Sequence, residues 1–168
     1  MLIVFGGLPG TGKTTISRVI ARWHSATYLR IDAIEQAIRD AVVLDGDVDV
    51  GPAGYVVANV LAESNLTSGQ TVVADCVNPV AESRAAWRAV ASRAKVRLVE
   101  VEVICSDFLE HRRRVEGRTS DIPGLIHPTW QAILERHYEP WKEPHLTIDT
   151  ASLSPDDSVL AVERYISA

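Results

Sequence analysis

The chain opens with LIVFGGLPGTGKTT, residues 2–15, in which a short apolar run stops at two glycines. Such a run is typical of a strand buried in a parallel sheet. The apolar residues that come next recur at helical spacing, namely Ile16, Val19, Ile20 and Trp23. This part of the chain is therefore predicted to form a strand, a glycine-rich turn and a helix, in that order.

The glycine-rich turn fits the pattern G-x-x-x-x-G-K-[ST], known as the P-loop, over Gly7, Leu8, Pro9, Gly10, Thr11, Gly12, Lys13 and Thr14. Glycines let successive backbone N–H groups turn toward one anion, and the following helix presents the positive end of its dipole to it. Lys13 would then bind the β- and γ-phosphates of ATP, and the Thr14 hydroxyl would bind Mg²⁺. A glycine-rich turn with an incidental lysine is the alternative, but the preceding strand favours an ATP·Mg²⁺ site that extends to Thr15.

Length and composition favour a single domain over residues 1–168. The net charge of −5 comes from dispersed acidic residues, so extended nucleic-acid binding, which needs a basic surface, is not expected. The two cysteines, Cys76 and Cys105, are too few for a disulfide framework. No apolar stretch reaches the length that a bilayer requires, and a cytoplasmic protein that does not bind membranes is therefore expected.

Strands and helices are predicted to alternate along the rest of the chain. Apolar runs predict strands at residues 27–31, 71–74, 96–104 and 146–148, and helical patterns begin near Ile34, Tyr55, Pro79, Ser106, Pro128 and Ser154. Ser106 is predicted to cap the helix that follows it. The helix from Pro128 is expected to reach Trp141, and residues 44–54 are expected to form an exposed loop. The alternation predicts an α/β fold, a parallel sheet with helices on both faces and ligands at the carboxyl ends of the strands.

Two of the predicted strands end in an aspartate at the edge where the phosphates should lie. Asp32 is predicted to be the base that accepts the proton of an acceptor hydroxyl, and its alternative role is to cap the helix that begins there. Asp75 occupies a position where a carboxylate can hold Mg²⁺, or can act on the acceptor. Ordinary turn chemistry before Asn78 and Pro79 is the alternative for Asp75.

Several polar residues near these aspartates are candidates for binding the acceptor. Gln36 and Arg39 share a helical face with Asp32, although a solvated face is an equal alternative. Tyr55 and Asn59 share a face of the next helix, and Asn78 closely follows Asp75. The predicted acceptor pocket therefore comprises Asp32, Gln36, Arg39, Tyr55, Asn59 and Asn78.

A basic helix precedes a polar, turn-like segment, and together they predict a lid over ATP at about residues 112–127. Arg114 and Arg118, spaced i to i+4, are predicted to stabilise the charge on the transferring phosphoryl group, and Arg112 is predicted to bind the nucleotide. The alternative is a solvated helix face that pairs with Glu110 and Glu116. The histidines are scattered without ligand spacing, so no zinc site is expected.

These motifs resemble those of the small P-loop kinases, which include AAA_33 or zeta-toxin-like, chloramphenicol phosphotransferase-like, adenylyl-sulfate-kinase-like and polynucleotide 5′-kinase-like proteins. The resemblance spans Gly7–Thr14, the Asp32 strand end, Asp75–Pro79, Arg112–Arg118 and Asp149–Thr150. It implies a five-stranded parallel sheet of order 2-3-1-4-5, Asp32 as the base, and a segment from Asp149 through Thr150 to Leu153 beside the adenine. Many of these kinases carry an arginine three residues after the base, where this chain has Glu35, and this departure disfavours a phosphate-bearing or nucleic-acid acceptor.

The function that the sequence favours is transfer of the γ-phosphoryl group of ATP to a hydroxyl of a small molecule, a metabolite or an antibiotic. A polynucleotide or nucleoside 5′-hydroxyl kinase and a nucleotide-binding module without catalysis are the alternatives. A GTPase is disfavoured because the chain has no Asn-Lys-x-Asp motif. A remodelling ATPase is disfavoured because Cys76, and not a second acidic residue, follows Asp75.

Overall fold

The computed structural model describes residues 1–42 and 50–168. Residues 44–49 of the expected loop thus lie outside the described residues, and Gly51 and Pro52 form a turn before the next helix. The elements are β1 (Leu2–Gly6), α1 (Lys13–Trp23), β2 (Thr27–Arg30), α2 (Ile31–Val42), α3 (Ala53–Thr67), β3 (Val72–Asp75), α4 (Ala81–Ala94), β4 (Leu98–Ile104), α5 (Phe108–Gly117), α6 (Trp130–Leu134), β5 (Leu146–Asp149) and α7 (Pro155–Ser167).

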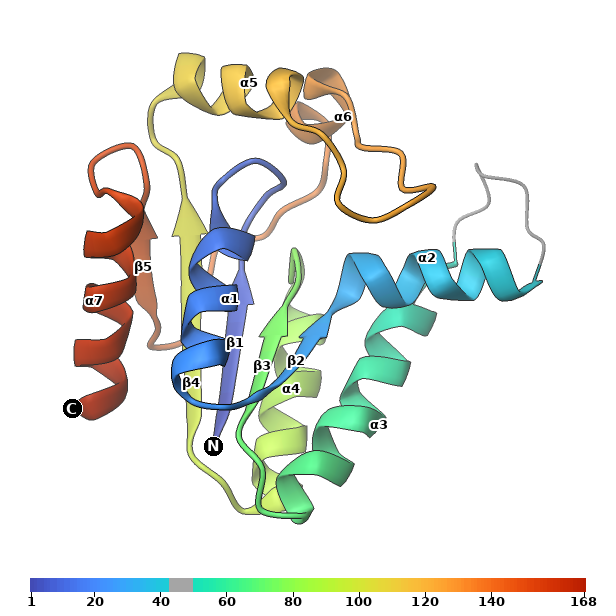
Figure 1. Cartoon of the computed structure of the whole chain (residues 1–168), viewed down its shortest axis with the longest axis vertical. Helices are drawn as coiled ribbons and strands as arrows, with labels where there is room; N and C mark the ends of the chain where they lie inside the picture. The colour runs from blue at the N-terminus through green and yellow to red at the C-terminus, as the bar shows by residue number, and fades with distance from the viewer. Residues whose placement is uncertain (43–49) are drawn as a thin grey trace.

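The described strands form one parallel sheet in the order β2-β3-β1-β4-β5, which confirms the predicted topology. Leu2 is paired with Val72 of β3 on one side and with Leu98 of β4 on the other. Every residue of β1 is buried because neighbouring strands and helices cover the centre of the sheet. The P-loop follows β1, so this central strand carries the phosphate-binding turn to the middle of the carboxyl edge (Figure 1).

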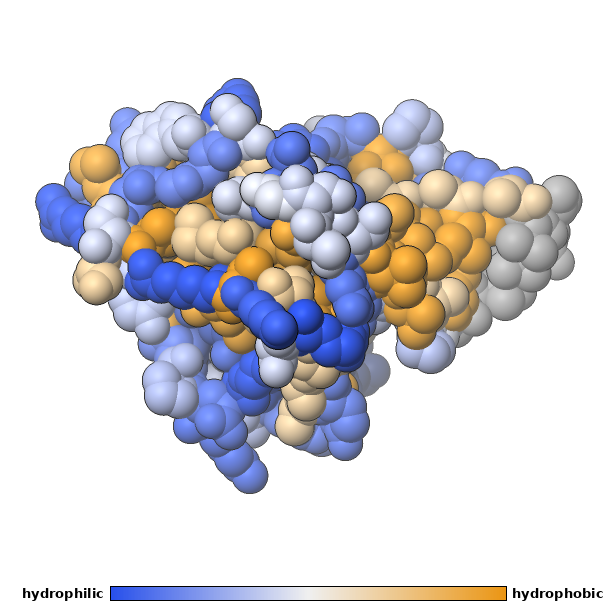
Figure 2. All heavy atoms as spheres, turned by 90° about the horizontal axis from the view of Figure 1, so that it is seen from below, coloured by the Kyte–Doolittle hydropathy of each residue, from blue (hydrophilic) through white to orange (hydrophobic). Residues whose placement is uncertain are grey.

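Helices cover both faces of the sheet (Figure 1). One core contains Leu2 and Val4 of β1 with residues of α3 and α4, and the other contains Ile3 and Phe5 with residues of α1 and α7. The alternation of side chains along β1 thus divides one strand between two cores. On the side where α3 lies, Figure 2 shows apolar side chains at the surface, and Val56, Val57, Val60 and Leu61 of α3 are exposed.

The charged residues of β4 have a structural explanation. Val99, Val101 and Val103 belong to the core beneath α1 and α7, and Glu100 and Glu102 point to the opposite face. Arg88 of α4 donates from Nε to Glu100 at 2.9 Å, and Tyr138 donates to Glu102 at 2.9 Å. The alternating pattern in β4 therefore reflects one apolar face and one face that is covered by polar partners.

Three local predictions were wrong. Asp32 lies within the first turn of α2 and does not precede the helix, because the helix begins immediately after β2 at Ile31. Helix α5 is capped by Asp107, whose carboxylate accepts from the amides of Leu109 and Glu110, and the Ser106 hydroxyl donates to Asp149 instead.

The third wrong prediction concerns the helix expected from Pro128 to Trp141, of which only α6 forms. The residues after α6 are held by partners outside it. The Glu139 amide donates to the Pro79 carbonyl at 2.8 Å, and Arg84 donates to the carbonyls of Glu139 and Pro140. These tertiary contacts replace the helical hydrogen bonds that the apolar spacing predicted.

Candidate active site

The P-loop is a turn that only glycine can make at its key positions. Gly7, Gly10 and Gly12 have φ angles of +139°, +86° and +93°, in the region that L side chains rarely adopt. A Cβ atom on Gly7 would lie 2.2 Å from the carbonyl oxygen of Val103 in β4. The loop therefore depends on glycine both for its backbone angles and for its close approach to the neighbouring strand.

Five backbone amides of the loop have no acceptor within residues 1–42 and 50–168, those of Leu8, Gly10, Gly12, Lys13 and Thr14. The amide of Gly7 is already used, because it donates to the Val77 carbonyl at 3.0 Å, and that of Thr11 donates to Leu8. Unpaired amides at the start of a helix form a binding site for an anion. Lys13 is 6% exposed and adds a positive charge to the same place.

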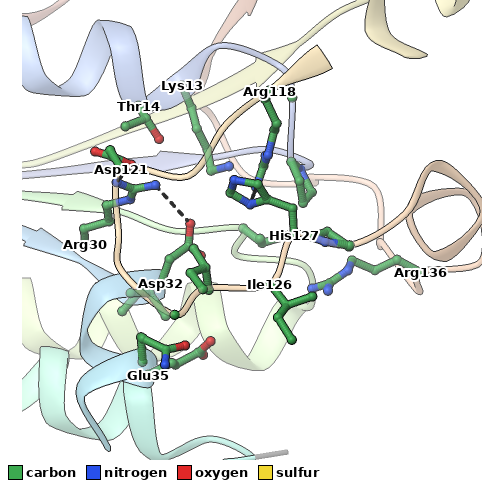
Figure 3. Close-up of a pocket in the computed structure, with 18 of the residues that line it drawn as sticks. Lys13, Thr14, Arg30, Asp32, Glu35, Arg118, Asp121, Ile126, His127 and Arg136 are labelled. Carbon is green, nitrogen blue, oxygen red and sulfur yellow. Dashed lines mark hydrogen bonds and ion pairs between the residues drawn. The ribbon is translucent and has the colours of Figure 1, made fainter. Parts of the chain in front are cut away.

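A cavity of about 1070 Å³ extends from the P-loop along the carboxyl edge of the sheet. Its wall contains P-loop residues, residues of α2 between Ile31 and Asp40, Tyr55 of α3, and most of residues 118–128, which we call the lid loop. Figure 1 shows α5 and α6 above this edge of the sheet, and Figure 3 shows the side chains that line the cavity. The volume exceeds what a phosphate cradle alone requires and leaves space for a second ligand.

Asp32, the predicted base, lines this cavity. Its carboxylate oxygen Oδ2 is 3.6 Å from the Nη2 atom of Arg30, the last residue of β2. Figure 3 shows this ion pair beneath Lys13 and Thr14. The side chain of Asp32 is 33% exposed, so it remains accessible to a ligand.

Asp121 connects the lid loop to the body of the domain. Its carboxylate accepts from Arg30 Nη1 at 2.8 Å and also from Arg18 of α1. These two guanidinium groups, that of Arg18 above all, lower the pKa of Asp121 far below its ordinary value. The lid loop therefore lies against the end of β2 and against the first helix.

Arg118 and His127 come together at the two ends of the lid loop. Arg118 donates from Nη2 to His127 Nδ1, while its Nε atom is buried and has no acceptor in the described part of the chain. Burial lowers the pKa of Arg118. Burial and the nearby Arg118 lower the pKa of His127, so the ring is neutral at neutral pH. A half-buried guanidinium group whose Nε donor lacks an acceptor among the described residues is suited to an anionic ligand.

Arg114 is joined to the loop after β5. It donates from Nη1 to the Thr150 hydroxyl at 2.8 Å and from Nη2 to the Thr150 carbonyl at 3.1 Å, and the Thr150 hydroxyl reaches the Thr11 carbonyl at 2.8 Å. The structure thus brings Arg114, Thr150 and the P-loop together. It does not bring Arg112 there, because this exposed side chain pairs with Glu116 and lies outside the cavity.

Asp75 lies at the end of β3, close to the P-loop in the sheet, since Phe5 is its partner in β1. It is 2% exposed, and the Tyr28 hydroxyl donates to its Oδ2 atom at 2.7 Å. Burial, followed by the charge of Asp75, raises the pKa of Tyr28. Asp75 does not line the cavity wall directly.

The other predicted acceptor residues divide into two groups. Gln36, Arg39 and Tyr55 line the cavity. Asn59 and Asn78 do not, although the Asn78 amide donates to the Tyr55 hydroxyl at 2.8 Å and so helps to place that ring.

Sequence reasoning missed cavity residues that no motif marks, namely Arg30, Glu35, Asp40, Asp121, His127 and Arg136. Arg30 had a weak signal, because it ends a strand next to Asp32. Asp121 and His127 belong to the predicted lid segment, in which nothing distinguishes residues that face the cavity from those that face solvent. Only the folded chain shows their positions.

The family of the chain is shown by a family model described as AAA domain, which matches residues 2–140. The chain belongs to this family. An uncharacterized protein of Mycobacterium tuberculosis, Rv2004c, is 32% identical over 162 residues, which cover 89% of this chain and 32% of that protein. The chain thus spans about one third of the length of this curated relative.

Solved structures share the whole fold. A gluconokinase from Sinorhizobium meliloti has a TM-score of 0.66 at 20% identity, over 98% of this chain and 93% of that one. Kti12 of Chaetomium thermophilum, solved in complex with ADP-AlF3, has a TM-score of 0.72 at 21% identity, over 100% and 98% of the two chains. The fold is that of the P-loop kinases. Among the described residues, no helix is both long and apolar enough to span a membrane.

Proposed function

We propose that this protein transfers the γ-phosphoryl group of ATP to a hydroxyl group of a small molecule, with Asp32 as the base. One observation carries the proposal: Lys13, Arg118 and Asp32 line a single cavity that continues beyond the phosphate cradle. A site for nucleotide alone would not need a carboxylate and further polar side chains on the far side of the cations. The kinase fold and the family membership support the same reaction class.

The phosphate groups are bound by the P-loop. The amides of Gly10, Gly12, Lys13 and Thr14 point at the β-phosphate, and the ammonium group of Lys13 lies beside the β- and γ-phosphates. Arg118 reaches the same region from the lid loop and stabilises the charge that develops on the γ-phosphoryl oxygens. Arg114 and Thr150 border the nucleotide on the side of α5 and β5.

The residues present fit a magnesium ion. The Thr14 hydroxyl lines the cavity, and the carboxylate of Asp75 lies at the end of the neighbouring strand. Mg²⁺ in such sites is held by one or two protein oxygens together with phosphate oxygens and water. When bound, Mg²⁺ would supply positive charge that neutralises part of the charge on the phosphates.

The chemical step requires a hydroxyl group between Asp32 and the γ-phosphorus. The acceptor oxygen forms a bond to the γ-phosphorus, the bond from that phosphorus to the bridging β–γ oxygen breaks, and ADP leaves. The hydroxyl proton passes to the Asp32 carboxylate. Arg30, 3.6 Å from that carboxylate, fixes its orientation, and the lid loop excludes water from the reacting groups.

The test is ATP consumption with a panel of sugars, polyols, nucleosides, aminoglycosides, other antibiotics and 5′-hydroxyl oligonucleotides, with Lys13→Ala as the blank. We expect at least one small alcohol to raise ADP release above this blank, and Asp32→Asn to reduce that rate by at least about 100-fold. Asp40→Asn is the matched control, since Asp40 lies on the same helix and also lines the cavity. Equal activity of Asp32→Asn and Asp40→Asn would show that Asp32 is not the base.

The same assay separates the rival functions. A 5′-hydroxyl kinase would respond to the oligonucleotides and not to the small alcohols. A nucleotide-binding module without an acceptor would bind ATP with the wild-type P-loop and lose this binding in Lys13→Ala, but no compound would change its turnover.

A further inference from the structure

Arg136 is a cation of the cavity wall that the proposed phosphate site does not use. It lies two residues after the end of α6 and lines the same cavity as Lys13 and Asp32. Figure 3 shows its side chain reaching toward Ile126, on the side of the cavity opposite Asp32. No ion pair or hydrogen bond joins its guanidinium group to any residue in the part of the chain that the structure describes.

The backbone around Arg136 is held in place. Its own amide donates to the Ile133 carbonyl. Three residues further on, Glu139 is held through its backbone and its side chain. Its backbone amide donates to the Pro79 carbonyl, and its carboxylate accepts from the Ala81 amide at 2.8 Å. Arg136 therefore lies between a short helix and a segment that is hydrogen-bonded to Pro79 and Ala81. These bonds fix the position of its backbone relative to the cavity wall at Pro79.

The other cations of the cavity have partners or roles. Arg30 is paired with Asp32 and Asp121, Arg114 is paired with Glu110, and Arg39 also has a partner. Lys13 and Arg118 face the phosphates in the proposed function. Within the described residues, Arg136 thus remains as a positive charge with no ion-pair partner, beside the space left for the acceptor.

The surroundings of Arg136 favour a ligand of low charge. Glu35 and Asp40 of α2 line the same cavity and would repel a doubly charged phosphate group more strongly than a carboxylate. Ile126, Val77 and Pro79 supply apolar surface for a carbon skeleton. A guanidinium group donates two parallel hydrogen bonds to a carboxylate, a geometry that also fixes the orientation of the ligand.

We propose that Arg136 binds a carboxylate of the acceptor, and that the acceptor is therefore a hydroxy acid. The inference rests on the proposed function and names the class of its substrate. The hydroxyl that receives the phosphoryl group lies at Asp32, and the carboxylate lies across the cavity at Arg136.

The experiment measures phosphoryl transfer to matched compounds with the wild-type protein and with Arg136→Ala, Arg136→Lys and Lys142→Ala. The probes are aldonic, uronic and other hydroxy acids, each paired with its neutral alcohol or amide, and the corresponding sugar phosphates. Lys142→Ala is the control, since this exposed residue belongs to the same segment and lies outside the cavity. ADP release gives KM and kcat for the acceptor and, separately, KM for ATP.

We expect one or more acids to have a KM at least about tenfold below that of the neutral partner. Arg136→Ala should raise the KM of the acid at least about tenfold, should leave the KM of ATP unchanged, and should abolish the preference for the acid. Arg136→Lys should recover part of the preference, and Lys142→Ala should behave as wild type.

Two results would overturn the inference and leave the proposed function standing: neutral alcohols accept phosphate as well as the acids, or Arg136→Ala affects both members of a pair equally. A preference for sugar phosphates would show that Arg136 binds a phosphate group of the acceptor and not a carboxylate. If no compound raises ADP release above the Lys13→Ala blank, the inference and the proposed function fail together. This outcome is distinct, because ADP release then stays at the blank in the wild-type protein and in both Arg136 variants alike.

Discussion

Arg30 and Asp121 are 91 positions apart in the chain, and the Nη1 atom of Arg30 donates to Oδ1 of Asp121 at 2.8 Å. The same guanidinium group lies 3.6 Å from Asp32. One arginine at the end of β2 therefore contacts both the lid loop and the proposed base. The two carboxylates face different nitrogens of the guanidinium group, Nη1 for Asp121 and Nη2 for Asp32, and the buried Nε donor has no acceptor among the described residues.

Asp121→Asn should lower the free energy of unfolding by about 1 kcal/mol at neutral pH, since Asp121 is 49% exposed and solvent screens its two ion pairs. The pKa of Asp121 is lowered in the folded protein, first of all by Arg18, from an ordinary value of 3.8. A lowered pKa means that the carboxylate stabilises the fold above about pH 4 and that this contribution is lost as the pH falls further.

The difference in melting temperature between wild type and Asp121→Asn should therefore be constant from about pH 5 to 8 and should shrink as the pH falls below about 4. Asp156→Asn, an exposed position in the first turn of α7, serves as the control. A difference as large at about pH 3 as at neutral pH would contradict the ion pairs.

Gly10→Ala should cost more stability than Gly69→Ala, although both glycines have a φ angle of +86°. The shared φ angle costs about 1 to 2 kcal/mol for an alanine at either position. At Gly10 the new Cβ would also lie 2.5 Å from Val115 Cγ2, whereas nothing lies within 4 Å at Gly69. Crowding at Gly10 should add about 1 to 3 kcal/mol and should weaken ATP binding.

Denaturant unfolding of the two variants measures this difference, and a fluorescent nucleotide measures ATP binding. Gly69→Ala should bind nucleotide as wild type does, because Gly69 lies between α3 and β3, away from the P-loop. Equal losses of stability in both variants would show that the approach of Val115 to the P-loop is not tight.

Arg84→Ala should destabilise the protein by at least about 3 kcal/mol. The side chain is 3% exposed and donates to the backbone carbonyls of Asn78, Pro79, Glu139 and Pro140. Its guanidinium group also lies 4.8 Å from the centroid of the Trp141 ring. Removal would leave these carbonyls without their donor and would leave a cavity beside the ring.

The control is Arg93→Ala, since this exposed arginine of the same helix pairs with Glu63 at the surface, where solvent screens the pair and its loss should change stability little. Arg84→Lys retains the charge and part of the hydrogen bonding, and should lie between wild type and Arg84→Ala if the latter folds poorly. Similar unfolding free energies for Arg84→Lys and Arg93→Ala would mean that the four contacts contribute little.

Asp75→Asn distinguishes the two roles predicted for this residue. If Asp75 helps to hold Mg²⁺, the variant should need about tenfold more Mg²⁺ for half-maximal ATP turnover and should keep the KM of the acceptor. If Asp75 acts on the acceptor, the KM of the acceptor should rise and the Mg²⁺ dependence should stay the same. Tyr28→Phe removes the hydrogen bond to Asp75 but leaves the Asp75 carboxylate in place. It should change the Mg²⁺ requirement and the KM of the acceptor by less than about threefold.

The parts of the fold that the sequence predicts are those that depend on local pattern. The apolar run before Gly7, the glycine positions and the alternation of strands and helices are each readable within a short window, and the sheet order followed from the resemblance to known kinases. The length of α6 could not be predicted, because Arg84, which lies in α4, replaces the helical partners of residues 139 and 140. The cap of α5 was misplaced by one residue, since Ser106 and Asp107 are both good caps and only the bond from Ser106 to Asp149 decides between them.

The residues of the candidate site also divide into those that local sequence predicts and those that only the folded chain brings together. Lys13 and Thr14 follow from a motif, and Asp32 follows from its place at the end of a strand. Arg30, Asp121 and Arg136 come from three distant segments, and no spacing in the sequence relates them.

The contacts of Arg84 also bear on which residues could move if the proposed lid opens. Its guanidinium group fastens the turn at Asn78 and Pro79 to the segment at Glu139 and Pro140, so these two stretches move as one body. If the proposed lid opens during turnover, its hinges are expected outside this body, between Gly117 and Glu135, while the wall at Pro79 and the segment that follows α6 stay in place. Product release would thus swing Arg118 and Asp121 outward while the floor of the acceptor pocket keeps its shape.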